Sequence, residues 1–594
     1  MHACRLSEEA IWVPFSDSRL RVIVDLNSGS PHFWKEEQTM ATKVIDRTPS
    51  AYDCPLLIKH ILHTPLRIAP GREIVYRDVK RYDYVTLNKR IGQLANAMQE
   101  MGIKAGDTVG VLDYDSHRYF ECFFAIPMMG AILHTVNWRL SPEQILYTIN
   151  HAEDDALLVH VDFLPVVEKF LSEMKTVKRL IVLNDKEPFP KPSFDISGEY
   201  EALVEASPGS YDFPDFDENS RATVFYTTGT TGAPKGVYFS HRQLVLHTLA
   251  AATNMAYQSG RAGLGFDDVY MPITPMFHVH AWGIPYVATM LGVKQVYPGR
   301  YVPGEILELI AKEGVTFSHC VPTILHMLLT SPVCDTVDLS GWKVIIGGSA
   351  FPKALCTAAL KKGMNVYSAY GMSETCPILT VTHFKTHMLE WDEQEKTTIR
   401  CRTGLPLPLV DLQIVDPAGH DVPHDGVSVG EVVVRSPWLT QGYFKETVRA
   451  EELWANGWLH TADVGWIDQE GYLQVTDRIK DVIKTGGEWL SSLQIEDILT
   501  QHEAVSEAAV VGVPHETWGE RPYALVTIKE KYAGKVSEED LKEFFKGFVD
   551  KGVISKWAVP DRVALVASIP KTSVGKLDKK EIRKAVTGQI STKS

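Results

Sequence analysis

Residues 226–237 read Tyr226-Thr-Thr-Gly-Thr-Thr-Gly-Ala-Pro-Lys-Gly-Val237, a run dense in glycines and hydroxyl groups that also carries a lysine. Glycines let the backbone turn sharply and bring amide N–H groups close to an anion, and threonine hydroxyls add donors. The stretch therefore predicts a phosphate-binding loop, which we favour over a Gly/Thr-rich surface turn. Its spacing is not that of a Walker P-loop. The candidate contacts are Thr227, Thr228, Gly229, Thr230, Thr231, Gly232 and Lys235.

Helix-like and strand-like segments alternate on both sides of this loop. Apolar residues recur at helical spacing over 87–101, residues 106–112 predict a turn that leads into a short strand, and 156–161 predict another strand. Such alternation predicts an α/β fold with mostly parallel sheets. Between 184 and 218 the composition shifts to Pro, Ser, Asp and Gly, which predicts a connecting surface loop.

The chain of 594 residues is too long for one core, because single cores stop growing near ~250–300 residues. A change of pattern near residue 476 precedes a last segment with its own helices and strands. The irregular start lacks the layout of a secretory signal, and Met40 is an alternative first residue. We expect a poorly ordered extension over 1–39, an N-terminal domain over 40–476, a hinge at 477–480 and a C-terminal domain over 481–594.

The composition is that of a soluble globular protein, with 45% hydrophobic and 23% charged residues. A formal net charge of −14 argues against a nucleic-acid partner. No apolar run reaches the ~18 residues of a membrane span. The eight cysteines form no C-x-x-C pair, so neither a zinc site nor a dithiol motif is indicated, and their scatter fits the reducing cytoplasm.

Four further motifs follow the loop in order. They are Tyr370-Gly-Met-Ser-Glu374, Trp458-Leu-His-Thr-Ala-Asp463, Asp477-Arg-Ile-Lys-Asp481 and Pro570-Lys-Thr-Ser-Val-Gly-Lys576. Together with the loop, they resemble the signature motifs of the adenylate-forming superfamily in order and spacing, from about residue 50 to the end. Two other runs resemble the bacterial medium- and long-chain fatty acyl-CoA synthetases: Pro275-Met-Phe-His-Val-His-Ala-Trp282 and Gly486-Gly-Glu-Trp-Leu490.

This resemblance implies a large α/β N-terminal domain of several subdomains, with mixed and parallel sheets, and a small mobile α+β C-terminal lid. It also implies that a carboxylic acid reacts with ATP to give acyl-AMP and pyrophosphate, and that CoA then displaces AMP. No protein nucleophile is needed, so none of the cysteines is nominated. The fatty acyl relatives are commonly homodimers, and we expect the same here.

The first set of implied roles concerns phosphate and metal. The transition state in which the carboxylate attacks the α-phosphorus of ATP is highly anionic, so cations are needed there. Glu374 and Thr227 match the positions that hold Mg²⁺, a hard ion that prefers oxygen ligands. Ser373 stands where the family more often has threonine, and it keeps the hydroxyl. Lys576 matches the lysine that stabilises adenylate formation.

The second set concerns the nucleotide. Asp463 can accept both ribose hydroxyls, with Arg478 behind it. A rival interpretation of residues 346–349 as a phosphopantetheine site is rejected, because the flanking helices of a carrier domain are absent. Relatives swing the small domain about a hinge residue that corresponds to Lys480. The positions matching adenylate contacts are Gly348, Ser368, Ala369, Tyr370, Lys480, Lys484 and Trp489.

The aromatic-rich run over 277–286 matches the acid-binding channel. Val279 and Trp282 correspond to acyl-contacting positions, with Trp282 resembling a gate, and His278 matches a catalytic gating position. His280 stands where relatives often carry a smaller polar residue. Buried core aromatics are the competing interpretation of this run. A metal site is not favoured, because no third ligand follows at suitable spacing.

The sequence therefore predicts an ATP-dependent medium- or long-chain fatty acid:CoA ligase. A ligase for another acid, such as a short thioether, branched or aryl acid, is the alternative. A non-catalytic adenylate- or acyl-binding sensor and a luciferase-like oxygenase are further rivals. The chemistry that the motifs indicate does not identify the acid.

Overall fold

The computed structural model describes residues 20–24, 31–35, 43–190, 192–227, 233–256, 263–485, 488–571 and 577–591. The chain divides into two compact units, 1–54 and 55–594. In the first, β1 (Leu20–Val24) and β2 (Pro31–Lys35) pair antiparallel. Most of the predicted extension lies outside the described residues, so its disorder stays a prediction.

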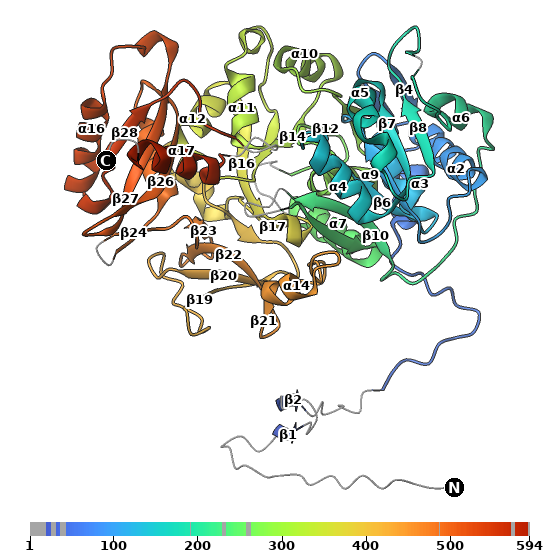
Figure 1. Ribbon diagram of the computed structural model, residues 1–594, viewed down its shortest axis with the longest axis horizontal. Coiled ribbons are helices and arrows are strands. Elements are labelled where there is room, and N and C mark those ends of the chain that lie inside the picture. Colours follow the sequence, from blue (N-terminus) through green and yellow to red (C-terminus); the bar gives the residue numbers. More distant parts are fainter. Residues whose placement is uncertain are drawn as a thin grey trace. The chain divides into compact units, whose positions relative to one another are not determined.

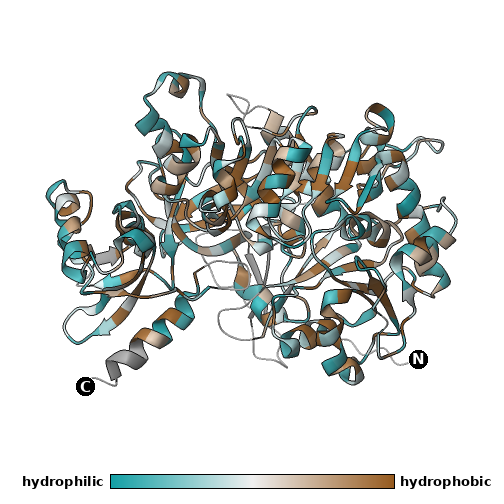
Figure 2. Cartoon of the chain, turned by 90° about the horizontal axis from the view of Figure 1, so that it is seen from above, coloured by the Kyte–Doolittle hydropathy of each residue, from teal (hydrophilic) through white to brown (hydrophobic). Residues whose placement is uncertain are grey.

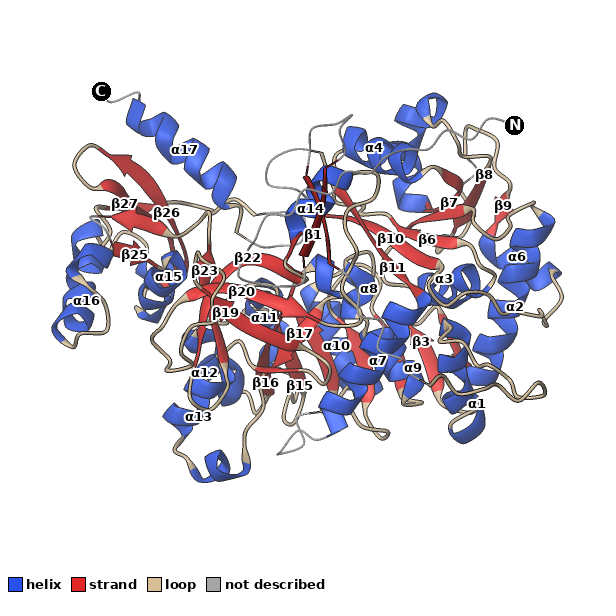
Figure 3. Ribbon diagram, turned by 90° about the horizontal axis from the view of Figure 1, so that it is seen from below, coloured by secondary structure: helices blue, strands red, loops and turns tan. Residues whose placement is uncertain are grey.

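A seven-stranded sheet carries the predicted phosphate loop (Figure 1). Its pairs are parallel except for the antiparallel pair between its first two strands. The prediction of mostly parallel sheets holds for this sheet, whereas the two five-stranded sheets are mainly antiparallel. Helices cover both faces, as such a sheet requires (Figure 3). In spatial order the strands are β11 (Lys235–Ser240), β10 (Arg221–Thr227), β6 (Ile132–Thr135), β5 (Thr108–Leu112), β7 (Asp154–His160), β8 (Arg179–Leu183) and β9 (Gly198–Glu199).

A nine-stranded sheet carries the predicted adenine-lining positions. Its central pairs are parallel, and the pairs at its two ends are antiparallel. In spatial order the strands are β18 (Leu405–Pro406), β17 (Ile378–Val381), β16 (Asn365–Gly371), β15 (Lys343–Ile346), β14 (Phe317–Cys320), β12 (Val269–Pro272), β13 (Lys294–Tyr297), β3 (Glu73–Tyr76) and β4 (Lys80–Asp83).

Two five-stranded sheets follow in the chain. In the last one, β27 lies between β26, at one edge, and β24 and β28 on its other side. Helices α15 (Ser492–Gln501) and α16 (Glu538–Asp550) pack on one face of this sheet and α17 (Lys579–Ser591) on the other. The first contains β19 (Asp411–Val415), β20 (Gly430–Arg435), β21 (Trp454–Ala455), β22 (Trp458–Ile467) and β23 (Leu473–Arg478). The last contains β24 (Ile483–Thr485), β25 (Glu488–Leu490), β26 (Val505–His515), β27 (Gly519–Ile528) and β28 (Arg562–Leu565).

The helices bury apolar faces against these sheets, and many central strands are hydrophobic while outer turns are hydrophilic (Figure 2). None of the helices in the described ranges has both the length and the apolar character to cross a membrane. The helices are α1 (His63–Ile68), α2 (Tyr84–Glu100), α3 (His117–Met128), α4 (Pro142–Ala152), α5 (Leu164–Val167), α6 (Tyr200–Ala206), α7 (His241–Ala256), α8 (Val279–Trp282), α9 (Ile284–Met290), α10 (Pro303–Glu313), α11 (Pro322–Leu329), α12 (Lys353–Lys361), α13 (Glu393–Arg400), α14 (Thr447–Leu453), α15 (Ser492–Gln501), α16 (Glu538–Asp550) and α17 (Lys579–Ser591).

Two helices test the sequence predictions. The helix predicted over 87–101 is α2, which begins at Tyr84. The carboxylate of Asp83, just before it, accepts a hydrogen bond from the Thr86 backbone N–H and caps the helix. The surface loop predicted over 184–218 was wrong in part, because it contains β9 and α6. The phenol of Tyr200 in α6 donates to the buried Glu121 carboxylate at 2.6 Å, a long-range partner that local composition does not reveal.

Asp115, in the turn after β5, fixes the segment that leads into the predicted acid channel. Its Oδ1 accepts a hydrogen bond from the Met276 backbone N–H at 2.8 Å, and its Oδ2 accepts from the Tyr301 hydroxyl at 2.6 Å. Burial raises the pKa of Asp115 to about 7, against the opposing effect of these two hydrogen bonds. In the folded protein, Asp115 therefore keeps its proton to a higher pH than an ordinary aspartate does.

We expect Asp115 to make thermal stability fall as the pH rises. An aspartate of ordinary pKa 3.8 in the unfolded chain has already released its proton at pH 5, whereas the folded protein holds it until about pH 7. The stability from this group is complete below pH 4 and is lost as the pH rises through 7, by about 3 kcal/mol between pH 5 and 8. Calorimetric melting temperatures at pH 5, 6, 7 and 8 should fall more steeply for the wild type than for Asp115→Asn. Identical pH profiles would contradict this role.

Candidate active site

The two ends of the predicted phosphate loop lie side by side. Thr227 ends β10 and Lys235 begins β11, and the two residues are directly paired in the antiparallel register. At Gly236, a side-chain Cβ would lie 3.1 Å from the Cβ of Phe444 and 3.2 Å from the Tyr226 ring, so the close approach favours glycine. Residues Thr228, Gly229, Thr230, Thr231 and Gly232 lie outside the described residues, and their phosphate contacts stay predictions.

Tyr443 joins Lys235 to Glu374. The Lys235 ammonium lies 4.4 Å from the centre of the Tyr443 ring, a cation–π contact. The Tyr443 hydroxyl donates to Glu374 Oε1 at 2.7 Å. The carboxylate raises the pKa of Tyr443, as does burial, which is the larger cause. Tyr443 was not predicted, because nothing near it in the chain points to a residue 69 positions away.

Glu374 suits a hard cation. It is 8% exposed, in a 3-10 turn (Ser373–Thr375), and its carboxylate accepts a hydrogen bond from the neutral Tyr443 hydroxyl. The Arg478 cation interacts with it electrostatically. No cluster of three or more His, Cys, Asp and Glu side chains suited to a metal is present in the part of the chain described. A site with few protein ligands, completed by substrate phosphates and water, is typical of Mg²⁺.

Asp463 is held from both sides by two other predicted residues. The β22–β23 register pairs it with Arg478, whose Nε lies 3.3 Å from Asp463 Oδ1. The Tyr370 hydroxyl donates to Asp463 Oδ2 at 2.7 Å. The carboxylate is 6% exposed. The structure therefore brings Tyr370, Asp463 and Arg478 together as one polar group, although they lie up to 108 positions apart, from 370 to 478.

The predicted adenine-lining residues lie at the carboxyl ends of two neighbouring parallel strands. Ile346 of β15 is level with Ser368 of β16, so Gly348 lies beyond the end of β15, and Ala369 and Tyr370 follow on β16. Ligands bind at the carboxyl ends of strands in α/β folds. Ser368 and Ala369 are 5% and 8% exposed, and Ser373 begins the turn that carries Glu374.

The acid-channel run forms a left-handed turn rather than an ordinary helix. Val279, His280, Ala281 and Trp282 have φ of 48°, 55°, 47° and 60°. Left-handed backbone costs roughly 1–2 kcal/mol for each such residue, so this turn is strained. Its position supports the idea of a functional site, since strain of this kind is concentrated at such sites. His278, just before the turn, is partly exposed, and its backbone N–H donates to the Pro275 carbonyl at 2.9 Å.

Trp282 packs closely against Gly347. A Cβ at Gly347 would lie 3.0 Å from Cη2 of Trp282 and 3.1 Å from the Ala369 carbonyl oxygen. On the other side the His319 ring lies 4.9 Å from the Trp282 ring, centroid to centroid. The tryptophan thus touches the strand ends that carry the adenine-lining residues. Gly347 and His319 are not among the predicted site residues, because each contacts Trp282 from a distant part of the chain.

The structure describes only some of the candidate site residues after residue 478. Lys480 follows Arg478 in the turn before β24, and its carbonyl accepts from Arg583 of α17 at 3.2 Å. Lys484 lies on β24, opposite Trp489 of β25, and its backbone N–H donates to Glu520 at 3.0 Å. The side chain of Trp489 and all of Lys576 lie outside the described residues, so their roles stay predictions.

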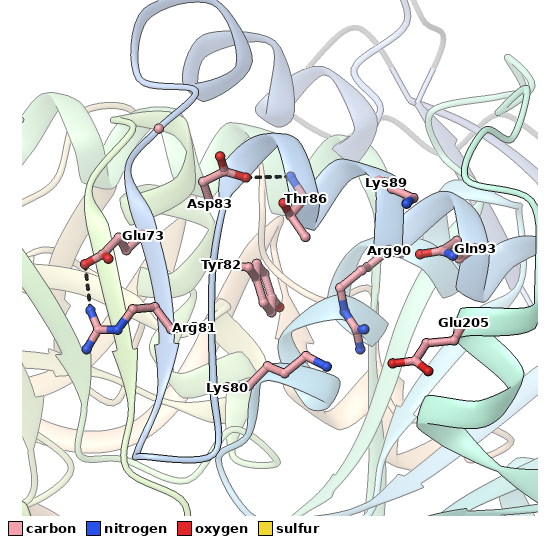
Figure 4. A pocket seen from close by; sticks show the side chains of 11 residues that line it. Glu73, Lys80, Arg81, Tyr82, Asp83, Thr86, Lys89, Arg90, Gln93 and Glu205 are labelled. Atoms are coloured by element: carbon pink, nitrogen blue, oxygen red, sulfur yellow. Dashed lines mark hydrogen bonds and ion pairs between the residues drawn. The ribbon is translucent and has the colours of Figure 1, made fainter.

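An open pocket of about 670 Å³ lies apart from these residues, between β3–β4 and α2 (Figure 4). Its cations are paired with acids: Arg81 with Glu73 at 2.7 Å and Arg90 with Glu121 at 2.7 Å. None of the predicted site residues lines it.

Comparisons with known proteins show the family of the chain. The AMP-binding enzyme family matches residues 64–444, and the AMP-binding enzyme C-terminal domain matches 494–576. The long-chain-fatty-acid–CoA ligase of Thermus thermophilus is 40% identical over 524 residues, covering 86% of this chain and 92% of that protein. The 3-methylmercaptopropionyl-CoA ligase of Ruegeria lacuscaerulensis is 38% identical, covering 89% and 97%.

The solved structure of an anthranilate CoA ligase in complex with anthranoyl-AMP has the same fold. Its TM-score is 0.80 at 24% identity, and the match covers 91% of this chain and 99% of that chain. This likeness confirms the predicted architecture of a large α/β domain followed by a smaller C-terminal domain. The chain belongs to the AMP-binding enzyme family.

Proposed function

We propose that this protein is an ATP- and CoA-dependent acid:CoA ligase that activates a medium- or long-chain fatty acid. The observation that carries the proposal is the assembly of Lys235, Tyr443 and Glu374 at the phosphate loop together with the Tyr370–Asp463–Arg478 group. The likeness to a long-chain fatty-acid ligase at 40% identity favours the fatty acid.

The reaction has two steps. A carboxylate oxygen of the acid attacks the α-phosphorus of ATP, the bond to the bridging oxygen breaks, and pyrophosphate leaves. The sulfur of CoA, as thiolate, then attacks the acyl carbon and AMP leaves with the former carboxylate oxygen. Glu374 and Thr227 would hold Mg²⁺, which neutralises phosphate charge when bound. Lys576 would supply positive charge to the first step.

The remaining residues position the substrates. Asp463 would accept the two ribose hydroxyls, and Arg478 and Tyr370 fix its orientation. Residues 477–480 would act as the hinge between an N-terminal domain over 40–476 and a lid over 481–594. Gly348, Ser368, Ala369, Ser373, Lys484 and Trp489 would line the adenylate, and His278, Val279 and Trp282 the acid. We further propose, from the resemblance to fatty acyl ligases, a cytoplasmic homodimer.

A short thioether acid is the second candidate substrate. The likeness that favours it is the 3-methylmercaptopropionyl-CoA ligase at 38% identity, close to the 40% of the fatty-acid ligase. A panel of acids separates the two candidates. Pyrophosphate release should be fastest with acids of eight or more carbons, as a medium or long chain requires. Faster release with 3-methylmercaptopropionate would overturn the fatty-acid assignment while leaving the ligase assignment intact.

We expect Lys576→Ala to separate the two half-reactions. Loss of its charge should slow adenylate formation by about 10²-fold or more, since one preorganised charge-stabilising donor contributes this much. Thioester formation from supplied acyl-AMP should stay within about threefold of the wild type, because the second step needs another domain orientation. Lys571→Ala, in the same segment, is the control. Equal loss in both half-reactions would exclude this role.

Asp463→Asn should weaken ATP binding selectively. The amide keeps one acceptor oxygen, so one of the two proposed ribose contacts is lost. Its NH₂ group is a donor, so it can neither accept the hydrogen bond from Tyr370 nor form the ion pair with Arg478. Hydrogen bonds to charged groups contribute roughly 1.5–3 kcal/mol, so KM for ATP should rise about 10- to 100-fold. Steady-state kinetics should show little change in KM for the acid. Asp411→Asn, at an exposed position, is the control; a rise confined to KM for the acid would contradict the ribose role.

A further inference from the structure

His280 is a buried polar side chain for which the described part of the chain provides no hydrogen-bond partner. Its ring is fully buried, and neither Nδ1 nor Nε2 has a hydrogen-bond partner among the residues that the structure describes. Burial, with a smaller effect from His247, lowers the pKa of His280 to about 3. The imidazole is therefore neutral at physiological pH, and it offers one N–H donor and one nitrogen acceptor. Such groups are rarely left unpaired, so a partner is expected.

The aromatic side chains that the structure places around the His280 ring do not form a hydrogen bond with it. Four aromatic rings surround it: those of Phe123, Phe225, Phe239 and Tyr286 have centroids 5.9, 5.5, 6.4 and 6.3 Å from the imidazole centroid. They come from α3, β10, β11 and α9. Three of them have no polar atom, and the Tyr286 hydroxyl donates to the Phe123 carbonyl at 3.1 Å. We call this enclosure the aromatic box.

A second unpaired polar group lies in the same layer. Thr223 on β10 is fully buried, and its hydroxyl has no hydrogen-bond partner in the described part of the chain. It is paired directly with Phe239 of β11, and it lies two residues before Phe225, on the same face of the sheet. Two rings of the aromatic box thus flank a hydroxyl that lacks a partner.

The backbone holds His280 in this position at a cost. His280 lies in the left-handed turn, with φ of 55°, between Val279 and Trp282. These neighbours match the acyl-contacting positions, so the turn that carries His280 also carries the side chains proposed to touch the acid. Strain and an unpaired buried group coincide at one residue, which is typical of a functional position rather than of packing.

We propose that His280 binds a hydroxyl group on the acyl chain, and that the preferred substrate is a hydroxylated carboxylic acid. A hydroxyl both donates and accepts, so it matches the single donor and single acceptor of a neutral imidazole. A thioether sulfur is only a weak acceptor and would leave one ring nitrogen unpaired. This inference rests on the proposed ligase function and specifies its substrate class.

The experiment compares matched acids. Acid-dependent pyrophosphate release is measured for unsubstituted acids of 4 to 16 carbons and for each acid carrying one hydroxyl at successive positions. At one hydroxyl position, kcat/KM should exceed that of the parent acid by about tenfold, the equivalent of one good hydrogen bond. In His280→Phe, kcat/KM for the hydroxylated acid should fall to that for the parent acid, while the parent acid remains a substrate. His280→Asn, which keeps a donor and an acceptor and tolerates left-handed backbone, should retain part of it.

Phe239→Leu is the matched control. It enlarges the aromatic box without changing its polar groups, so it should alter the preferred chain length and leave the hydroxyl-to-parent ratio within about twofold. If no hydroxylated acid exceeds its parent, or if His280→Phe keeps the ratio, the inference is wrong and the ligase function stands. If none of the acids supports pyrophosphate release, the ligase function itself fails. Melting temperatures of the variants show whether each is folded.

Discussion

The antiparallel pairing of β10 with β11 is the constraint on which the rest of the site depends. It holds Thr227 directly opposite Lys235, so the phosphate loop between them begins and ends at one point of the sheet. The tight packing of Gly236 against Phe444 and Tyr226 fixes the chain just beyond the loop. From there the Tyr443 ring contacts Lys235, and its hydroxyl reaches Glu374. The predicted phosphate and metal contacts thus share one rigid frame.

A second pairing connects nucleotide binding with the C-terminal part of the chain. The β22–β23 register places Asp463 beside Arg478, and Lys480, the expected hinge residue, follows two positions later. Arg583 of α17 contacts this segment, because it donates to the Lys480 carbonyl and forms an ion pair with Asp481, just after the proposed hinge. A change at Asp463, the proposed ribose contact, would therefore act on the segment proposed to begin the small domain. Such coupling suits two half-reactions that need different domain orientations.

Sequence patterns predicted the α/β class, the mostly parallel sheets and helix α2, because these depend on local periodicity. The short motifs around Asp463 and Tyr370 predicted residues that the structure brings together, although no periodicity places them in contact. Tyr443, Gly347 and His319 were missed, since each acts through a partner distant in the chain. The left-handed turn at 279–282 was also unpredictable, because four non-glycine residues adopt a conformation against their own preference. The roles of Thr228–Gly232 and Lys576 are predictions from sequence alone.

The most direct measurement is mass spectrometry of the products formed from ATP and a fatty acid when CoA is left out. The proposed reaction predicts acyl-AMP on the enzyme and pyrophosphate in solution, in equal amounts, followed by acyl-CoA and AMP when CoA is added. Formation of ADP and an acyl phosphate, or acyl-CoA without a preceding adenylate, would contradict it.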